Sequence, residues 1–125
     1  MSTNRKGGSL PCGGAFRPAL RRASKSGYVA SGTDSPFPLG TQHEMEVLVE
    51  SGFTPMEAII AATGAAARVL NAPTIGTIAE GQWADLVLLD ANPLVDIRNT
   101  RTIREVIQGG RVVDRSLLRQ QTATR

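Results

Sequence analysis

The chain lacks several features that would widen the range of functions to consider. It has one cysteine, Cys12, so no internal disulfide can form, which fits a reducing compartment and leads us to expect a cytoplasmic location. No apolar run approaches the roughly 20 residues of a membrane span, so we expect no membrane association. With 125 residues, the chain is also too short for a complete eight-fold α/β barrel, which needs roughly 250.

Negative charge is absent from the first 33 residues. This stretch carries six lysines and arginines, whereas residues 34–125 carry eight arginines and all eleven acidic residues. A basic, acid-free terminus can be a mitochondrial transit peptide or a nucleic-acid-binding arm. It has no interleaved aromatic residues or dense charge clusters, so we favour a solvated tail and expect no nucleic-acid partner. Residues 1–14 are predicted to be a disordered basic tail and residues 116–125 a flexible tail.

Helical patterns dominate the middle of the chain. A short helix over 18–26, closed by Gly27, precedes a brief strand over Tyr28–Ser31. Apolar residues then recur at helical spacing, which predicts a helix over about 41–51 that ends at Gly52. Thr54 and Glu57 form a capping box for a buried helix from Pro55 to about Thr63. Gly64 is expected to separate it from a second helical segment over 65–70.

After Pro73 the pattern becomes extended. Residues 85–89 predict a buried strand, and residues 103–108 and 111–114 predict two more. Gly109 and Gly110 lie between the last two, which is a strong signal for a two-residue hairpin turn. The fold class is therefore α/β, and a sheet of so few strands should have edges that seek partners.

The order of these segments resembles the C-terminal end of a metal-dependent amidohydrolase, of the branch that contains imidazolonepropionase and Xaa-Pro dipeptidases. The resemblance covers about residues 15–115 and leaves residues 1–14 unmatched. Each motif alone is weak, and their order and spacing make the set specific. The matching motifs are Gly32-Thr33-Asp34-Ser35, His43-Glu44, Gly52-Phe53-Thr54-Pro55-Met56-Glu57-Ala58, Ala61-Ala62-Thr63, Gly76-Thr77-Ile78, Gly81-Gln82-Trp83-Ala84-Asp85-Leu86-Val87 and Val106 to Val113.

The resemblance implies an architecture. Residues 15–72 would be the last strand–helix unit of a (β/α)8 barrel, and residues 73–115 the C-terminal strands of a small β-sandwich domain. It further implies a hydrolase that acts on carbon–nitrogen bonds of a small molecule or a dipeptide-like substrate. Zinc or a similar divalent metal would activate the attacking water. A homo-oligomer would be compatible with this family.

Asp34 is the principal candidate site residue. The resemblance implies that it is both a metal ligand and the catalytic group that handles the proton of the attacking water. Independently, a carboxylate just beyond a barrel strand lies where such folds place catalysis, although Asp-Ser-Pro on its own is typical of a turn. Thr33 and Ser35 are candidates to orient Asp34.

The other singled-out residues have competing interpretations. For His43, the only histidine, we favour a surface residue near a helix start over a functional role; the functional alternatives are a substrate contact on the loop above the site and a helix-end residue that orders this loop. Asp85 is interpreted as structural. Trp83 is expected to pack between the barrel piece and the β domain.

Most of the metal ligands that the resemblance implies are missing from this sequence. It has no His-x-His pair, and a hydrolytic metal site needs about three protein ligands. We therefore expect a fragment that is inactive alone and does not bind the metal by itself. Two alternatives stay open: a non-catalytic module that pairs with a full-length homologue, and a nucleic-acid-binding protein that acts through residues 1–25.

Overall fold

The computed structural model describes residues 18–19, 22–23, 29–33 and 40–114. Of the predicted helix over 18–26, the described residues are helical. Val29 to Ser31, predicted as a strand, pair with no strand in the described part of the chain, so that prediction is wrong for these residues. Instead the Ser31 amide donates to the carbonyl of Ala61, 2.9 Å away. The predicted tails lie outside the described residues.

Helix α2 spans Gly40–Glu50, as the apolar spacing predicted. It ends in a Schellman motif, in which Gly52, at a φ of +101°, donates to Val49 and Phe53 donates to Leu48. Phe53 is 4% exposed, so the chain leaves the helix with an apolar side chain buried. The glycine stop is thereby confirmed.

A single helical run follows, made of α3 (Pro55–Ile60), a π-helical turn η1 (Ala61–Ala65) and α4 (Ala66–Val69). The predicted capping box at Thr54 and Glu57 is confirmed, with both reciprocal hydrogen bonds present. The predicted division at Gly64 is wrong. Gly64 is buried, and a Cβ there would lie 3.4 Å from the carbonyl oxygen of Gly76, so the glycine serves close packing within a helix that widens without stopping.

The sheet has three antiparallel strands in the order β1 (Leu86–Leu89), β2 (Ile103–Gln108), β3 (Arg111–Val112). Gly109 and Gly110 join β2 to β3 with φ values of +56° and +78°, the signature of a type I′ turn, so the predicted hairpin is confirmed. Strand β3 is shorter than the predicted 111–114.

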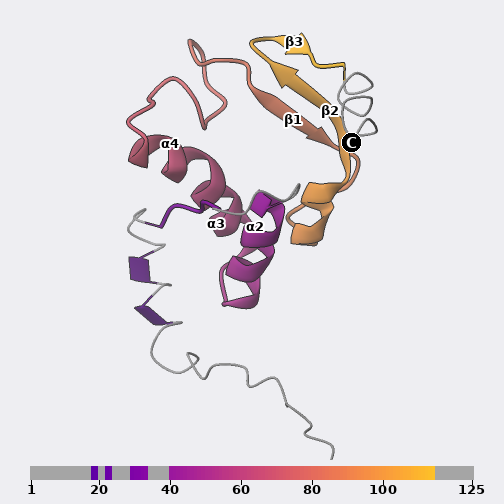
Figure 1. Ribbon diagram of the computed structural model, residues 1–125. Coiled ribbons are helices and arrows are strands. Elements are labelled where there is room, and N and C mark those ends of the chain that lie inside the picture. Colours follow the sequence, from indigo (N-terminus) through magenta and orange to yellow (C-terminus); the bar gives the residue numbers. More distant parts are fainter. Residues whose placement is uncertain (1–17, 20–21, 24–28, 34–39, 115–125) are drawn as a thin grey trace, which may run out of the picture.

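A 3₁₀ helix that the sequence patterns did not predict, η2 (Ile97–Arg101), connects β1 to β2 and lies against α2 (Figure 1). Asp96 caps it by accepting from the amide of Arg98. Ile97 is 6% exposed and joins Met45 and Ala58 in the core. Through η2 the sheet is tied to the helices.

The sheet itself is poorly covered, because none of its described strand residues is buried. Strand alternation places Leu86 and Val112 on one face and Val87 and Val106 on the other. Val87 is 55% exposed and Val112 is 63% exposed. Apolar side chains therefore face outward on both sides of the sheet.

Candidate functional site

The described structure reaches the candidate site from both sides without including its carboxylate. Asp34 and Ser35 lie outside the described residues, whereas Thr33 is described and exposed. On the other side, α2 begins at Gly40, close in space to Thr33, since a Cβ on Gly40 would lie 2.9 Å from the Thr33 Cγ2. The described residues on either side of 34–39 are thus neighbours. The predicted roles of Asp34, Thr33 and Ser35 stay predictions.

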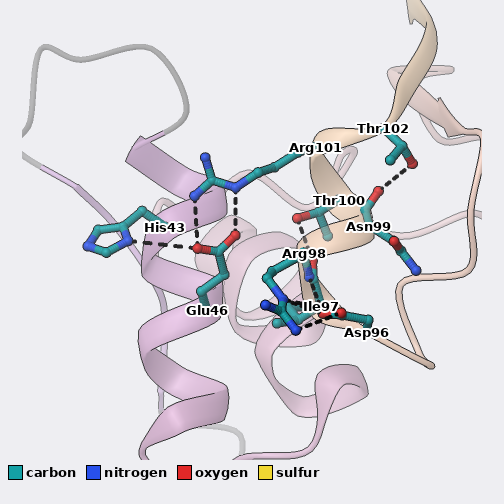
Figure 2. A network of polar contacts seen from close by, with 9 residues as sticks. All are labelled: His43, Glu46, Asp96, Ile97, Arg98, Asn99, Thr100, Arg101 and Thr102. Atoms are coloured by element: carbon teal, nitrogen blue, oxygen red, sulfur yellow. Dashed lines mark hydrogen bonds and ion pairs between the residues drawn. The ribbon is translucent and has the colours of Figure 1, made fainter.

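His43 lies in the first part of α2 and has a side chain that is 67% exposed. Its Nδ1 is 3.9 Å from Oε2 of Glu46, one turn along the same helix, which is an ion-pair distance and too long for a hydrogen bond (Figure 2). An imidazole in this setting is available to a ligand. Its role as a substrate contact stays a prediction.

Glu46 is the centre of the polar network that the structure adds to the sequence analysis. Arg101 Nε donates to Glu46 Oε1 at 2.6 Å, and Nη2 donates to Oε2 at 2.8 Å (Figure 2). The Arg101 hydrogen bond lowers the pKa of Glu46, and burial opposes this in part. The Glu46 carboxylate raises the pKa of Arg101. The pair joins α2 to η2.

A second pair lies beside the first, between Arg98 of η2 and Asp96, the residue that caps this helix. Arg98 donates through its backbone amide and its Nε to the Asp96 carboxylate, and these hydrogen bonds lower the pKa of Asp96. Figure 2 shows both arginines on the same short helix, facing α2 from one side. The network stabilises the helix junction and leaves His43 as its outermost member.

These residues do not constitute a metal centre. No group of three or more His, Cys, Asp and Glu side chains lies together in the part of the chain that the structure describes. His43 and Glu46 are only two potential ligands, and both carboxylate oxygens of Glu46 are bonded to Arg101. About three protein ligands are needed for a hydrolytic site, so the described residues do not fit one.

Asp85 and Trp83 both lie beside the Gly109–Gly110 turn. Asp85 is structural, as predicted, because its Oδ1 accepts from the amide of Gly109 at 2.7 Å and so holds the hairpin turn. Trp83 is 62% exposed, so its predicted place between helices and sheet is wrong. Its ring lies against the glycine turn, where it is 3.8 Å from the position of a Cβ on Gly109.

Sequence reasoning missed the Glu46–Arg101 pair and the helix that carries Arg101. The two residues are 55 positions apart, and no local pattern predicts such a pair. A signal for η2 was present, since Asp96 before a short polar segment is a favoured N-cap.

Within residues 40–114, no helix is long and apolar enough to cross a membrane.

Comparison with known proteins gives a consistent result. The model of the amidohydrolase family matches residues 18–114. Ochratoxinase from Aspergillus niger is 38% identical over 101 residues, which are 75% of this chain and 21% of the enzyme. The chain thus spans about a fifth of the length of the curated relatives that it matches.

Solved structures agree with the family match. Phenylurea hydrolase B is 46% identical with a TM-score of 0.62, and the alignment covers 70% of this chain and 20% of that one. An Xaa-Pro dipeptidase with methionine bound in its active site is 32% identical with a TM-score of 0.67, covering 79% and 25% respectively.

Proposed function

Because the chain belongs to the amidohydrolase family, we propose that it supplies the C-terminal part of a hydrolase acting on carbon–nitrogen bonds. The observation that carries this proposal is the family match over residues 18–114, with the motifs in the family's order. The chain covers 21% of ochratoxinase, so the complete activity would need the counterpart of the remaining four fifths of that enzyme.

Within that protein, residues 15–72 would close the barrel and residues 73–115 would belong to the small β-sandwich domain. Support comes from the uncovered sheet. A sheet with apolar side chains on both faces is normally an inner layer, because exposed apolar area of that kind is unfavourable. The likeness to the Xaa-Pro dipeptidase, at a TM-score of 0.67, is consistent with the same arrangement.

Asp34 would be the residue of this chain in the active site, as a ligand of the divalent metal on which the family in general depends. His43 would contact the substrate from the start of α2, where its ring is exposed. The remaining ligands would have to come from outside this sequence, which has one histidine. Alone, the chain is expected to bind no catalytic metal.

The substrate class follows from the relatives only in outline. A phenylurea hydrolase and an Xaa-Pro dipeptidase are both named for small substrates, which favours a small molecule or a dipeptide-like substrate here.

A second candidate function is a non-catalytic module that pairs with a full-length homologue. The exposed apolar residues on both faces of the sheet favour it, together with β1, which is an edge strand of four apolar residues in the described sheet. A stable complex of the chain with an intact relative, at unchanged activity of that relative, would support this alternative.

The proposal is tested by grafting. Residues 18–114 would replace the matching stretch of Aspergillus niger ochratoxinase, and hydrolysis of that enzyme's own substrate would be measured beside the isolated chain. We expect activity from the graft and none from the chain alone. A graft with the circular dichroism spectrum and melting temperature of the parent enzyme but without activity would contradict the proposal.

A further inference from the structure

The π-helical turn η1 interrupts an otherwise regular helical run from Pro55 to Val69. Such turns shift backbone carbonyls away from their usual donors four residues on, and they occur often at functional sites. Here the Thr63 hydroxyl also donates to the carbonyl of Ile59 at 2.7 Å, in competition with the regular backbone bond. The turn therefore offers backbone acceptors to segments outside the helix.

Two distant segments meet at this turn. On one side, the Ser31 amide donates to the Ala61 carbonyl at 2.9 Å. On the other, Gly76 packs so closely that a Cβ there would lie 2.9 Å from the Thr63 carbonyl oxygen and 3.1 Å from the Gly64 Cα. The turn is thus held from outside, and it has little freedom to move relative to the loop that leads into the sheet.

The contact with Ser31 is made by the backbone. The Ser31 hydroxyl is buried and has no hydrogen-bond partner among the described residues, so the side chain adds no bond to the helix. A buried unpaired hydroxyl is unfavourable, whereas the amide–carbonyl bond is favourable. Removal of the hydroxyl should therefore leave the segment in place, and removal of the amide hydrogen should release it.

We propose that η1 is a positioning element for the segment that enters the candidate site, acting through the Ala61 carbonyl on the peptide of Ser31. Ser31 lies three residues before Asp34, so fixing its peptide limits where the following carboxylate can lie. The functional part of this inference depends on the proposed role of Asp34. The docking, by which we mean the hydrogen bond from the Ser31 amide to the Ala61 carbonyl, does not depend on that role.

Amide hydrogen exchange of the full chain, measured by NMR, tests the docking directly. We expect the amide at position 31 to exchange at least about tenfold more slowly than in an unstructured peptide, because it is bonded. In Ser31→Ala the slow exchange should persist. Exchange at the free-peptide rate in both proteins would overturn the proposal, whatever the role of Asp34.

The effect on catalysis is measured in the ochratoxinase graft. Ser31→Pro removes the amide hydrogen and should lower kcat about 10- to 100-fold, the range seen when groups that orient a metal ligand are lost, with KM less affected. Ser31→Ala should keep the kcat of the graft. Equal kcat in an active graft with Ser31→Pro would overturn the positioning role. A graft inactive in every variant would instead count against the proposed function, and the exchange rates would still decide the docking.

Discussion

Arg101 binds Glu46 through two parallel hydrogen bonds, from Nε to Oε1 at 2.6 Å and from Nη2 to Oε2 at 2.8 Å. Arg101 lies on η2, which connects β1 to β2, and Glu46 lies on α2. Their pairing therefore holds the connection between the two strands against α2. Ile97, on the same 3₁₀ helix, packs beside Met45 in the core. Charge pairing and apolar packing therefore act at one junction.

Loss of this pair should destabilise the chain. Arg101→Gln is expected to lower the free energy of unfolding, because it removes a two-fold arginine–carboxylate contact to Glu46, whose side chain is only 16% exposed. The matched control is Arg104→Gln, which breaks the exposed pair with Asp90 and should cost close to zero. Urea unfolding measures the loss of unfolding free energy in both variants. Equal losses would contradict the conclusion that the Glu46–Arg101 pair stabilises the junction of α2 and η2.

The same pair makes stability depend on pH. Arg101 lowers the pKa of Glu46 in the folded chain below the ordinary glutamate value of 4.5. The contribution of the Glu46–Arg101 pair to the free energy of unfolding is therefore complete above about pH 4.5. It is lost as the pH falls through the lower pKa that Glu46 has in the folded chain. The difference in unfolding free energy between the wild type and Glu46→Gln should therefore shrink as the pH falls below about 4.5. A difference that grows on acidification would show the opposite sign of the shift.

Gly76 should be far less replaceable than Gly81, although both have positive φ values, of +86° and +79°. A Cβ at position 76 would lie 2.7 Å from the Cβ of Ala67, whereas at position 81 it would meet nothing within 4 Å. Gly76→Ala should cost about 3 kcal/mol, from overpacking added to backbone strain, and Gly81→Ala about 1 kcal/mol from strain alone. Thermal melts of the two variants test this, and similar losses would argue against close packing of Gly76 on the helical run of η1 and α4.

The uncovered sheet should make the isolated chain bind apolar dyes. We expect anilinonaphthalene sulfonate to bind, because Val87 and Val112 expose apolar surface on opposite faces. A Val87→Lys, Val112→Lys double variant should bind markedly less dye. Val69→Lys, which changes a still more exposed valine on α4, serves as the control. An isolated chain that binds no dye would contradict the interpretation that both faces need cover.

Local chemistry explains what the sequence could predict. Gly52, the capping box at Thr54, and the Gly109–Gly110 turn each depend on residues within a few positions of one another, and the structure confirms all three. Asp85 was also interpreted correctly as structural. In each case the residue type is selected by a short-range backbone requirement.

Long-range contacts explain the errors. The local sequence at Gly64 is typical of a helix break. A glycine is needed there because Gly76, 12 residues along the chain, packs closely against it, and no local pattern shows that contact. The 3₁₀ helix η2 depends on packing against α2, and no periodicity is visible in five residues. The segment from Val29 to Ser31 has the composition of a strand, but in the described structure it bonds to a helix carbonyl. Asp34 could be selected only through a family resemblance, since its sequence neighbours equally suit a turn.

We propose Asp34 as the residue that this chain contributes to the active site of an amidohydrolase. The most direct measurement is kcat of the ochratoxinase graft that carries residues 18–114, compared between Asp34→Asn and Asp85→Asn. Asparagine at position 85 can still accept from Gly109, so that variant should stay within about threefold of the graft. Asp34→Asn should lose at least about 100-fold with an unchanged melting temperature. An Asp34→Asn graft as active as the Asp85→Asn graft would contradict a role of Asp34 in the active site.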